Sequence, residues 1–126
     1  MTATFSRNVT IEICSNPEWL GASELAEGTC LSAGDLASVY FDAAERSLQK
    51  SGLFAAAEIT PSRRQRATYH GWNGASWFSG YRSGGVATMS KLSAKRQAAM
   101  DAADEAGRNA MTAAVTANAV SPDEAE

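Results

Sequence analysis

The dipeptide Asn73-Gly74, with aromatic segments on both sides, constrains the fold more than any other feature of the sequence. Asn and Gly both tolerate the positive φ angles of a type I′ turn, so ATYHGW before the dipeptide and ASWFSGY after it are predicted to pair. A two-residue turn would set Trp72 opposite Ala75. The sequence therefore predicts an antiparallel β-hairpin over residues 66–82.

This register gives the hairpin two different faces, because side chains alternate along a strand. The face expected to lie against the core carries small and apolar residues. The other face has the composition of a contact surface, and it holds Arg66, Thr68, His70, Trp72, Trp77, Ser79 and Tyr81. For Trp72 and Trp77 the alternative is a place at the edge of the core, since large aromatic side chains are mostly buried.

Two further strands are expected outside the hairpin. Apolar and polar residues alternate over residues 5–14, and a period of two indicates a strand. Residues 53–60 are apolar and short enough for a buried strand, although three alanines leave a helical continuation open. Pro61 and Ser62 are then expected to turn the chain.

Helices are predicted over residues 17–27 and 33–50. The first begins at Pro17, a residue suited to the first turn of a helix. The second follows Ser32 and Asp35, which have the spacing of a variant capping box, and its apolar residues recur at helical spacing.

An alanine-rich segment of high helix propensity extends from residue 86 to about residue 119. A continuous helix of ~34 residues would be ~50 Å long, whereas a compact domain of this size has a radius of gyration of ~14 Å. Either the helix breaks near Gly107, or its distal half packs against another chain. In the second case we expect self-association through the small side chains of Ala99, Ala103, Ala106, Ala110 and Ala113.

These elements predict one α+β domain over residues 1–120, followed by a disordered acidic tail at residues 121–126. The length of 126 residues suffices for a single domain. We expect a small antiparallel sheet covered on one face by helices. The strands of this sheet are 5–14, 53–60 and the 66–82 hairpin, and the covering helices are 33–50 and 86–106.

The composition excludes several classes of protein. No apolar run approaches the ~18 residues of a membrane span, and the first residues lack the pattern of a signal peptide, so we expect a cytoplasmic protein without membrane contact. Cys14 and Cys30 are the two cysteines, too few for a disulfide scaffold or a four-cysteine zinc site. Phosphate-loop, zincin and hydrolase motifs do not occur, and we expect neither a metal nor a cofactor.

No residue is favoured for catalysis. The single histidine, His70, has no carboxylate nearby in sequence with which to form a catalytic pair. Cys14 falls on the strand face opposite the apolar row, and Cys30 lies in a short connection. Either thiol could be a nucleophile, but small buried packing residues are the commoner case. We expect a protein that is not an enzyme, with chemistry at Cys30 or His70 as the weakest alternative.

The charged residues are unevenly distributed. The formal net charge is −3, yet the segment Ile59–Met100 contains no Asp or Glu. Clustered cations can contact phosphates even on a protein of negative net charge, whereas an ordinary charged run only solvates a surface. The segment carries seven positive side chains, those of Arg63, Arg64, Arg66, Arg82, Lys91, Lys95 and Arg96.

Aromatic rings beside arginines can stack on exposed bases while the guanidinium groups hold phosphates. The sequence therefore predicts a small binding protein whose partner is nucleic acid or another anionic surface, such as an acidic protein. The expected contact residues are Arg63, Arg64, Arg66, His70, Trp72, Trp77, Tyr81 and Arg82. The alternative is a homo-oligomeric structural or protein-inhibiting module, of the kind found as phage or mobile-element accessory proteins, that uses the alanine-rich helix.

Overall fold

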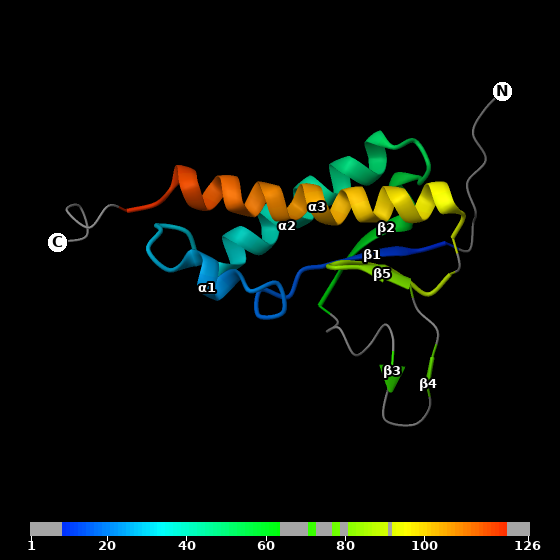
Figure 1. The fold of residues 1–126 in the computed structure, drawn as a ribbon, viewed down its shortest axis with the longest axis horizontal. Helices are drawn as coiled ribbons and strands as arrows, with labels where there is room; N and C mark the ends of the chain where they lie inside the picture. The colour runs from blue at the N-terminus through cyan, green and yellow to red at the C-terminus, as the bar shows by residue number, and fades with distance from the viewer. Residues whose placement is uncertain (1–8, 64–70, 73–76, 79–80, 91, 121–126) are drawn as a thin grey trace.

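The computed structural model describes residues 9–63, 71–72, 77–78, 81–90 and 92–120. It contains a four-stranded sheet, a separate two-stranded pair and two long helices, which confirms the predicted α+β class (Figure 1). In chain order the elements are β1 (Ile11–Cys14), α1 (Ala22–Ala26), α2 (Ala33–Lys50), η1 (Ala56–Glu58), β2 (Ile59–Ser62), β3 (Gly71–Trp72), β4 (Trp77–Phe78), β5 (Tyr81–Ser83), β6 (Val86–Thr88) and α3 (Ala94–Ala117).

The four-stranded sheet is mixed, with the strand order β2-β1-β6-β5. β1 pairs antiparallel with β6 but parallel with β2, where Ile11 lies opposite Ile59. The prediction of a purely antiparallel sheet is therefore wrong. The reason is that α2 lies between β1 and β2 in the chain and carries the chain back to the end of the sheet at which β1 began.

β2 begins later than predicted, because an irregular connection and η1 occupy the first part of the expected strand. The Glu58 carboxylate accepts a hydrogen bond from the Ala55 N–H at 2.8 Å, and alanine has low β propensity. The strand starts at Ile59 and continues through Pro61 and Ser62, so the turn predicted there is also wrong. Proline is tolerated because β2 is an edge strand.

β3 and β4 form an antiparallel pair within the predicted hairpin, but the register differs from the prediction. Trp72 lies opposite Trp77, and not opposite Ala75 as a two-residue turn requires. Residues 73–76 separate the two strands and lie outside the described residues, as do residues 64–70 and 79–80 of the same segment. The predicted two-residue turn is therefore wrong, although the predicted pairing of the two aromatic segments is correct.

A second hairpin joins β5 to β6. Ser83 pairs with Val86 across the two-residue connection Gly84-Gly85, and Gly84 has a φ of 55°. This positive φ favours glycine, because a Cβ atom would be strained there. The prediction that residue 86 begins the C-terminal helix is therefore wrong, since Val86–Thr88 completes the sheet instead.

α3 starts after Ser93, whose hydroxyl oxygen accepts a hydrogen bond from the Arg96 N–H at 3.3 Å and caps the helix. The helix runs without a break through Gly107, so the first of the two alternatives, a break near this residue, is wrong. Its 24 residues correspond to about 36 Å. Along this length α3 packs on α2 and, at its distal end, on residues 28–30 of the same chain.

The three remaining N-terminal predictions differ in their outcome. α2 confirms the helix predicted over residues 33–50. Its capping box forms because the Asp35 N–H donates to the Ser32 hydroxyl oxygen and the Ser32 N–H donates to the Asp35 carboxylate, both at 3.0 Å. α1 is shorter than the predicted helix 17–27, because turns precede it. β1 likewise covers only the end of the predicted strand 5–14, of which residues 5–8 lie outside the described residues.

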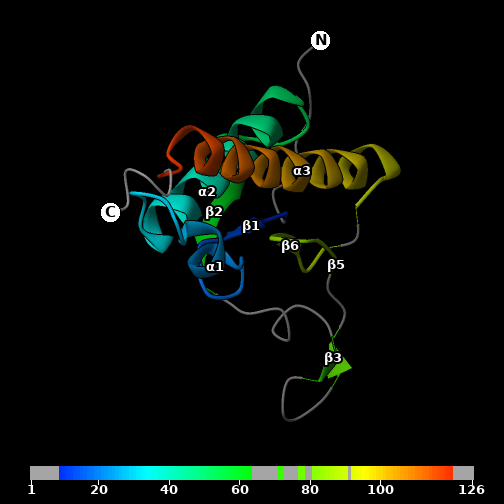
Figure 2. The ribbon, with the colours of Figure 1, turned by 60° about the vertical axis from the view of Figure 1, so that its left-hand side comes forward.

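The core lies between the sheet and the pair of helices. α2 and α3 pack side by side and cover one face of the sheet (Figures 1 and 2). Cys14 is buried as well, as a small packing residue would be. The largest fully buried side chains are those of Tyr40, Ile11, Ile13, Leu36, Leu48, Met100, Met111, Val86 and Thr88.

Candidate functional site

A groove opens at the end of the sheet where the parallel strands β1 and β2 both finish. Its volume is about 380 Å³, within the range of small-ligand pockets. Ligands commonly bind outside the carboxyl ends of parallel strands, because the connections diverge there. The groove is lined by Ser15, Pro17, Gly34, Ala37, Ser38, Phe41, Asp42, Pro61 and Arg63.

One wall of the groove consists of the two connections that leave β1 and β2. The Ser15 N–H and hydroxyl both donate to the Ser62 carbonyl, at 2.5 and 3.1 Å. The Asn16 side chain donates to the Arg63 carbonyl at 3.5 Å, and its oxygen accepts from the Glu18 N–H at 2.9 Å. These hydrogen bonds join the two connections, so this wall is formed without a ligand.

The facing wall is the first half of α2. Its lining residues recur at intervals of three and four along the helix, which places them on one face. Ala37 is buried and Phe41 is half-buried, whereas Ser38 and Asp42 are exposed. This wall therefore combines apolar surface with a hydroxyl and a carboxylate.

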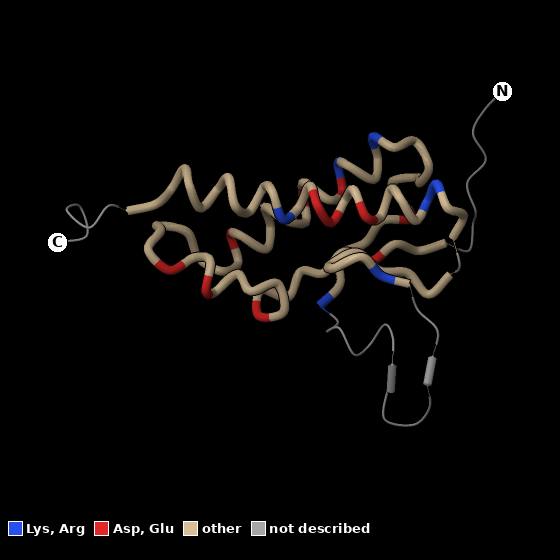
Figure 3. The backbone as a smooth tube through the Cα atoms, in the orientation of Figure 1, with Lys and Arg blue, Asp and Glu red and all other residues tan. Residues whose placement is uncertain are grey.

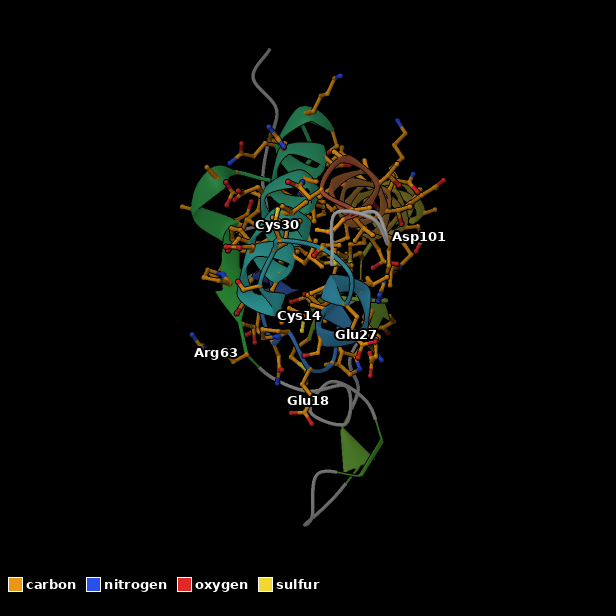
Figure 4. All side chains as sticks on the ribbon, turned by 90° about the vertical axis from the view of Figure 1, so that its left-hand side faces the viewer. Cys14, Glu18, Glu27, Cys30, Arg63 and Asp101 are labelled. Carbon is orange, nitrogen blue, oxygen red and sulfur yellow. The ribbon has the colours of Figure 1, made fainter. Side chains whose placement is uncertain are left out.

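Arg63 supplies the positive charge at the rim. Its side chain is exposed and projects outward from the end of β2, on the side of the molecule away from Asp101 (Figure 4). The described residues include an ion pair between Arg108 and Asp104 at 3.4 Å, in which Arg63 takes no part. The Arg63 guanidinium is therefore placed to receive an anion from solvent.

Arg82 lies on β5, at the opposite edge of the sheet from β2 and about 14 Å away across three strand spacings. Its guanidinium stacks on the Trp19 ring, 4.3 Å from the ring centroid, and donates to the Gly84 carbonyl. Arg82 and Trp19 are both half-buried. The structure thus engages Arg82 within the chain and does not bring it to the groove beside Arg63.

The cations of the acid-free segment do not gather on one surface in the described part of the chain. Arg96 lies over the Phe54 ring at 5.3 Å from the centroid, near the beginning of α3, whereas Arg63 lies at the end of β2. Acidic residues lie on the first half of α3, namely Asp101, Asp104 and Glu105, and around α1 and the beginning of α2, namely Glu18, Glu24, Glu27 and Asp35 (Figure 3). The groove lies between this acidic end and the exit of the basic segment.

Part of the predicted contact surface lies outside the described residues. This applies to Arg64, Arg66 and His70. For the two tryptophans, the described structure consists of the backbone pairing of β3 with β4. Tyr81 is half-buried at the beginning of β5, where it pairs with Thr88.

The alanines expected to mediate self-association have different environments. Ala99 and Ala103 are buried in the core of their own chain, because α3 packs on α2. Ala106 and Ala110 are half-buried, and Ala113 is exposed. The surface that α3 can offer to a second copy is therefore smaller than the predicted seam.

The distal end of α3 packs on its own chain. The Val120 N–H donates to the Gly28 carbonyl at 2.8 Å, and the Cys30 N–H donates to the Asn118 carbonyl at 3.4 Å. Thr29 and Ala119 form an antiparallel bridge between these bonds. The connection before α2 thus holds the end of α3, a role that the predicted partner chain would otherwise have.

The two cysteines lie in different environments. Burial raises the pKa of the Cys14 thiol, which disfavours the nucleophilic thiolate. Cys30 is exposed, and its thiol lies 3.5 Å from the Asn118 side-chain oxygen.

Across the described ranges, no three His, Cys, Asp or Glu side chains are placed to hold a metal ion. In the same ranges, no helix has both the length and the apolar character needed to cross a membrane.

Sequence reasoning did not identify the groove, although it named Arg63. The missed lining residues follow the end of β1, lie near the end of β2 or lie on the first half of α2. A strand–helix–strand pattern with parallel pairing would have pointed to the residues after each strand. The pattern was obscured because residues 53–58 resemble a strand and Pro61 resembles a turn.

Comparisons of the chain with protein-family models, with curated proteins and with solved structures found no match. The groove and its charges are therefore the basis of the functional proposal.

Proposed function

We propose that this protein binds single-stranded nucleic acid through the basic segment 63–82 and the groove from which that segment leaves the sheet. The observation that carries the proposal is the position of Arg63. This residue is exposed at the rim of the groove and leads directly into a stretch of sequence that is rich in arginine and tryptophan. Binding of an anion at the rim would therefore be continuous with binding along the segment.

The distribution of charge supports an anionic partner. The segment Ile59–Met100 contains no acidic residue, and three of its arginines, Arg63, Arg64 and Arg66, fall within four residues of the sequence. A local positive region attracts a polyanion even when the net charge of the protein is negative. A nucleic-acid strand that reaches the rim at Arg63 would continue toward the basic segment and away from the acidic end.

The β3 and β4 pair supports a single strand as the form of the partner. Trp72 and Trp77 are cross-strand partners in this ribbon. Aromatic rings on small β-ribbons and sheets stack on bases that are not paired, and each stacked base contributes about 1–3 kcal/mol. A paired duplex keeps its bases stacked on each other and offers no such contact.

The proposal is tested by comparing two arginine variants in oligonucleotide binding. Arg63→Ala removes the cation at the rim, and Arg46→Ala removes an exposed cation on α2 that is not part of the groove lining. We expect Arg63→Ala to weaken binding of a single-stranded oligonucleotide about threefold or more at low salt, while Arg46→Ala has little effect. Equal affinities of the wild type and both variants would contradict the proposed role of Arg63.

A further inference from the structure

We propose that the groove is a nucleotide subsite that accepts one guanine base of the bound strand. The inference deepens the proposed function and rests on it, since it assigns the contacts of one nucleotide within the strand. It is drawn from three features of the groove: the apolar part of its lining, the carboxylate of Asp42 and the guanidinium of Arg63.

The walls are suited to a flat aromatic ligand. Pro17 lies in the connection after β1, Pro61 lies near the end of β2, and Phe41 and Ala37 line the facing helix. Unpaired bases bind by stacking their faces on aromatic and other apolar side chains. The volume of about 380 Å³ lies near the lower end of the ligand-pocket range, which suits one nucleotide better than a larger ligand.

The carboxylate of Asp42 selects among the bases. A carboxylate only accepts hydrogen bonds, so it favours a base edge that presents donors. Guanine presents a ring N–H and an amino group side by side on its Watson–Crick edge, whereas adenine presents one donor beside an acceptor. Asp42 is exposed on α2, so its carboxylate is available to such an edge.

Arg63 supplies the contact for the phosphate. The guanidinium and the Asp42 carboxylate belong to opposite walls, since one follows β2 and the other lies on α2. A ligand that satisfies both must have an anionic group at one end and hydrogen-bond donors at the other. A guanine nucleotide has this polarity, whereas inorganic phosphate has only the anionic group.

The test is an NMR titration of the full chain with the 5′-monophosphates of guanosine and adenosine, and with guanosine itself. The guanine nucleotide is expected to shift the amide signals of Ser38, Asp42 and Arg63. Adenosine monophosphate should bind about tenfold more weakly, because one good bidentate contact discriminates by that order. Guanosine should bind more weakly than its monophosphate.

Two substitutions separate recognition of the base from recognition of the phosphate. Asp42→Asn replaces two acceptors by one donor and one acceptor, so the preference should move from guanine toward adenine. Glu45→Gln removes a charge from the same helix outside the groove lining and should leave the preference unchanged. Arg63→Ala should weaken both monophosphates to the same degree and leave guanosine unaffected.

The outcomes distinguish this inference from the proposed function. Oligonucleotide binding without a guanine preference, together with no shift of groove amides by the guanine nucleotide, would overturn the subsite and leave the proposed function standing. Shifts of the groove amides by the guanine nucleotide without oligonucleotide binding would support the subsite and overturn the proposed function. Saturable binding of a free amino acid such as tyrosine in the groove, in place of the nucleotide, would also overturn the subsite.

Discussion

The Tyr40 hydroxyl donates a hydrogen bond to the Asp104 carboxylate and thereby joins α2 to α3. The Gly85 N–H donates to the Tyr40 hydroxyl oxygen and to a carboxylate oxygen of Asp104, at 3.0 Å in each case. The β5–β6 connection is therefore attached to the same pair of residues. Tyr40 is fully buried, and Arg108 lies over its ring at 5.5 Å from the centroid. This cluster fixes α2, whose first half forms one wall of the groove.

Tyr40→Phe removes the hydroxyl while keeping the ring. We expect the free energy of unfolding to fall by about 1–2 kcal/mol, because one buried hydrogen bond to a charged group is lost. Tyr81→Phe removes the hydroxyl of a half-buried tyrosine and is expected to change the stability by less than about 0.5 kcal/mol. Urea unfolding of the two variants measures both effects, and equal stability of the two would show that the Tyr40 contact contributes nothing.

Alkaline pH should destabilise the protein through the same residue. Burial, with the Asp104 carboxylate as the next cause, raises the pKa of Tyr40 above its usual value of about 10. Above this pH the unfolded chain releases the Tyr40 proton while the folded chain retains it. The free energy of unfolding therefore falls as pH rises, by up to about 1.4 kcal/mol per pH unit from this group.

Other groups titrate in the same range, so the wild type is compared with Tyr40→Phe between pH 9 and pH 11, about one unit on either side of the unfolded pKa. The wild type should lose stability more steeply than the variant above about pH 10. Parallel curves for the two proteins would contradict the raised pKa of Tyr40.

Gly107→Ala should reverse the usual effect of replacing glycine in a helix. Alanine normally stabilises a helix interior by about 1 kcal/mol relative to glycine. A Cβ atom at Gly107 would lie 2.5 Å from the Tyr40 ring, so the ring or the helix must shift. We expect a loss of about 1–3 kcal/mol from this overpacking.

Gly34→Ala is the matched control, because a Cβ atom there meets only the Ser32 hydroxyl oxygen at 3.7 Å, an ordinary contact. This variant should be as stable as the wild type or more stable. If both alanine variants increase the melting temperature, the close contact of α3 with Tyr40 is not present in solution.

Substitution of the two hairpin tryptophans distinguishes a role in recognition from a role in folding. If Trp72 and Trp77 stack on bases, Trp72→Ala and Trp77→Ala should each weaken oligonucleotide binding by about 1–3 kcal/mol and leave the stability nearly unchanged. Trp19→Ala serves as the comparison for a ring that packs on the core, and we expect it to lower the stability by more than either hairpin variant. A loss of about 3 kcal/mol or more of folding stability in the Trp72 or Trp77 variant would instead make that ring a core residue.

Self-association through α3 is tested by Ala113→Glu. A contact made by small side chains would not tolerate a bulky charge, so an oligomer should become a monomer. Binding of nucleic acid by the basic segment should keep its affinity per chain and lose only avidity. Light scattering gives the oligomeric state, and titration of the same samples gives the affinity per chain. If the affinity per chain is lost together with the oligomer, the binding surface belongs to the assembly and not to the single chain.

The sequence predicted those parts of the fold that local signals determine. Helix 33–50 was predictable because Ser32 and Asp35 cap it and its apolar residues follow one period. The parallel pairing of β1 with β2 was not predictable, because it depends on contacts between residues far apart in the chain. The Gly84-Gly85 hairpin was missed because high alanine content nearby suggested a helix.

The candidate site was predictable only in part, for a related reason. Arg63 was identified from the run of basic residues, since charge distribution can be read directly from a sequence. Asp42 carries no such signal, because a single carboxylate on the polar face of an amphipathic helix is typical of a solvent-exposed surface. Only the return of the chain through α2 to β2 places it across the groove from Pro61 and Arg63.

The salt dependence of single-strand binding by the wild type tests the central claim most directly. Fluorescence anisotropy with a labelled oligonucleotide of mixed sequence is measured from about 50 to 200 mM salt. The proposed function predicts that the logarithm of the binding constant falls linearly with the logarithm of the salt concentration, with a slope of about 0.7 for each phosphate contacted. With Arg63 and its neighbours in contact, a slope of about 2 or more is expected. No binding at the lowest salt concentration, or an affinity independent of salt, would contradict the claim.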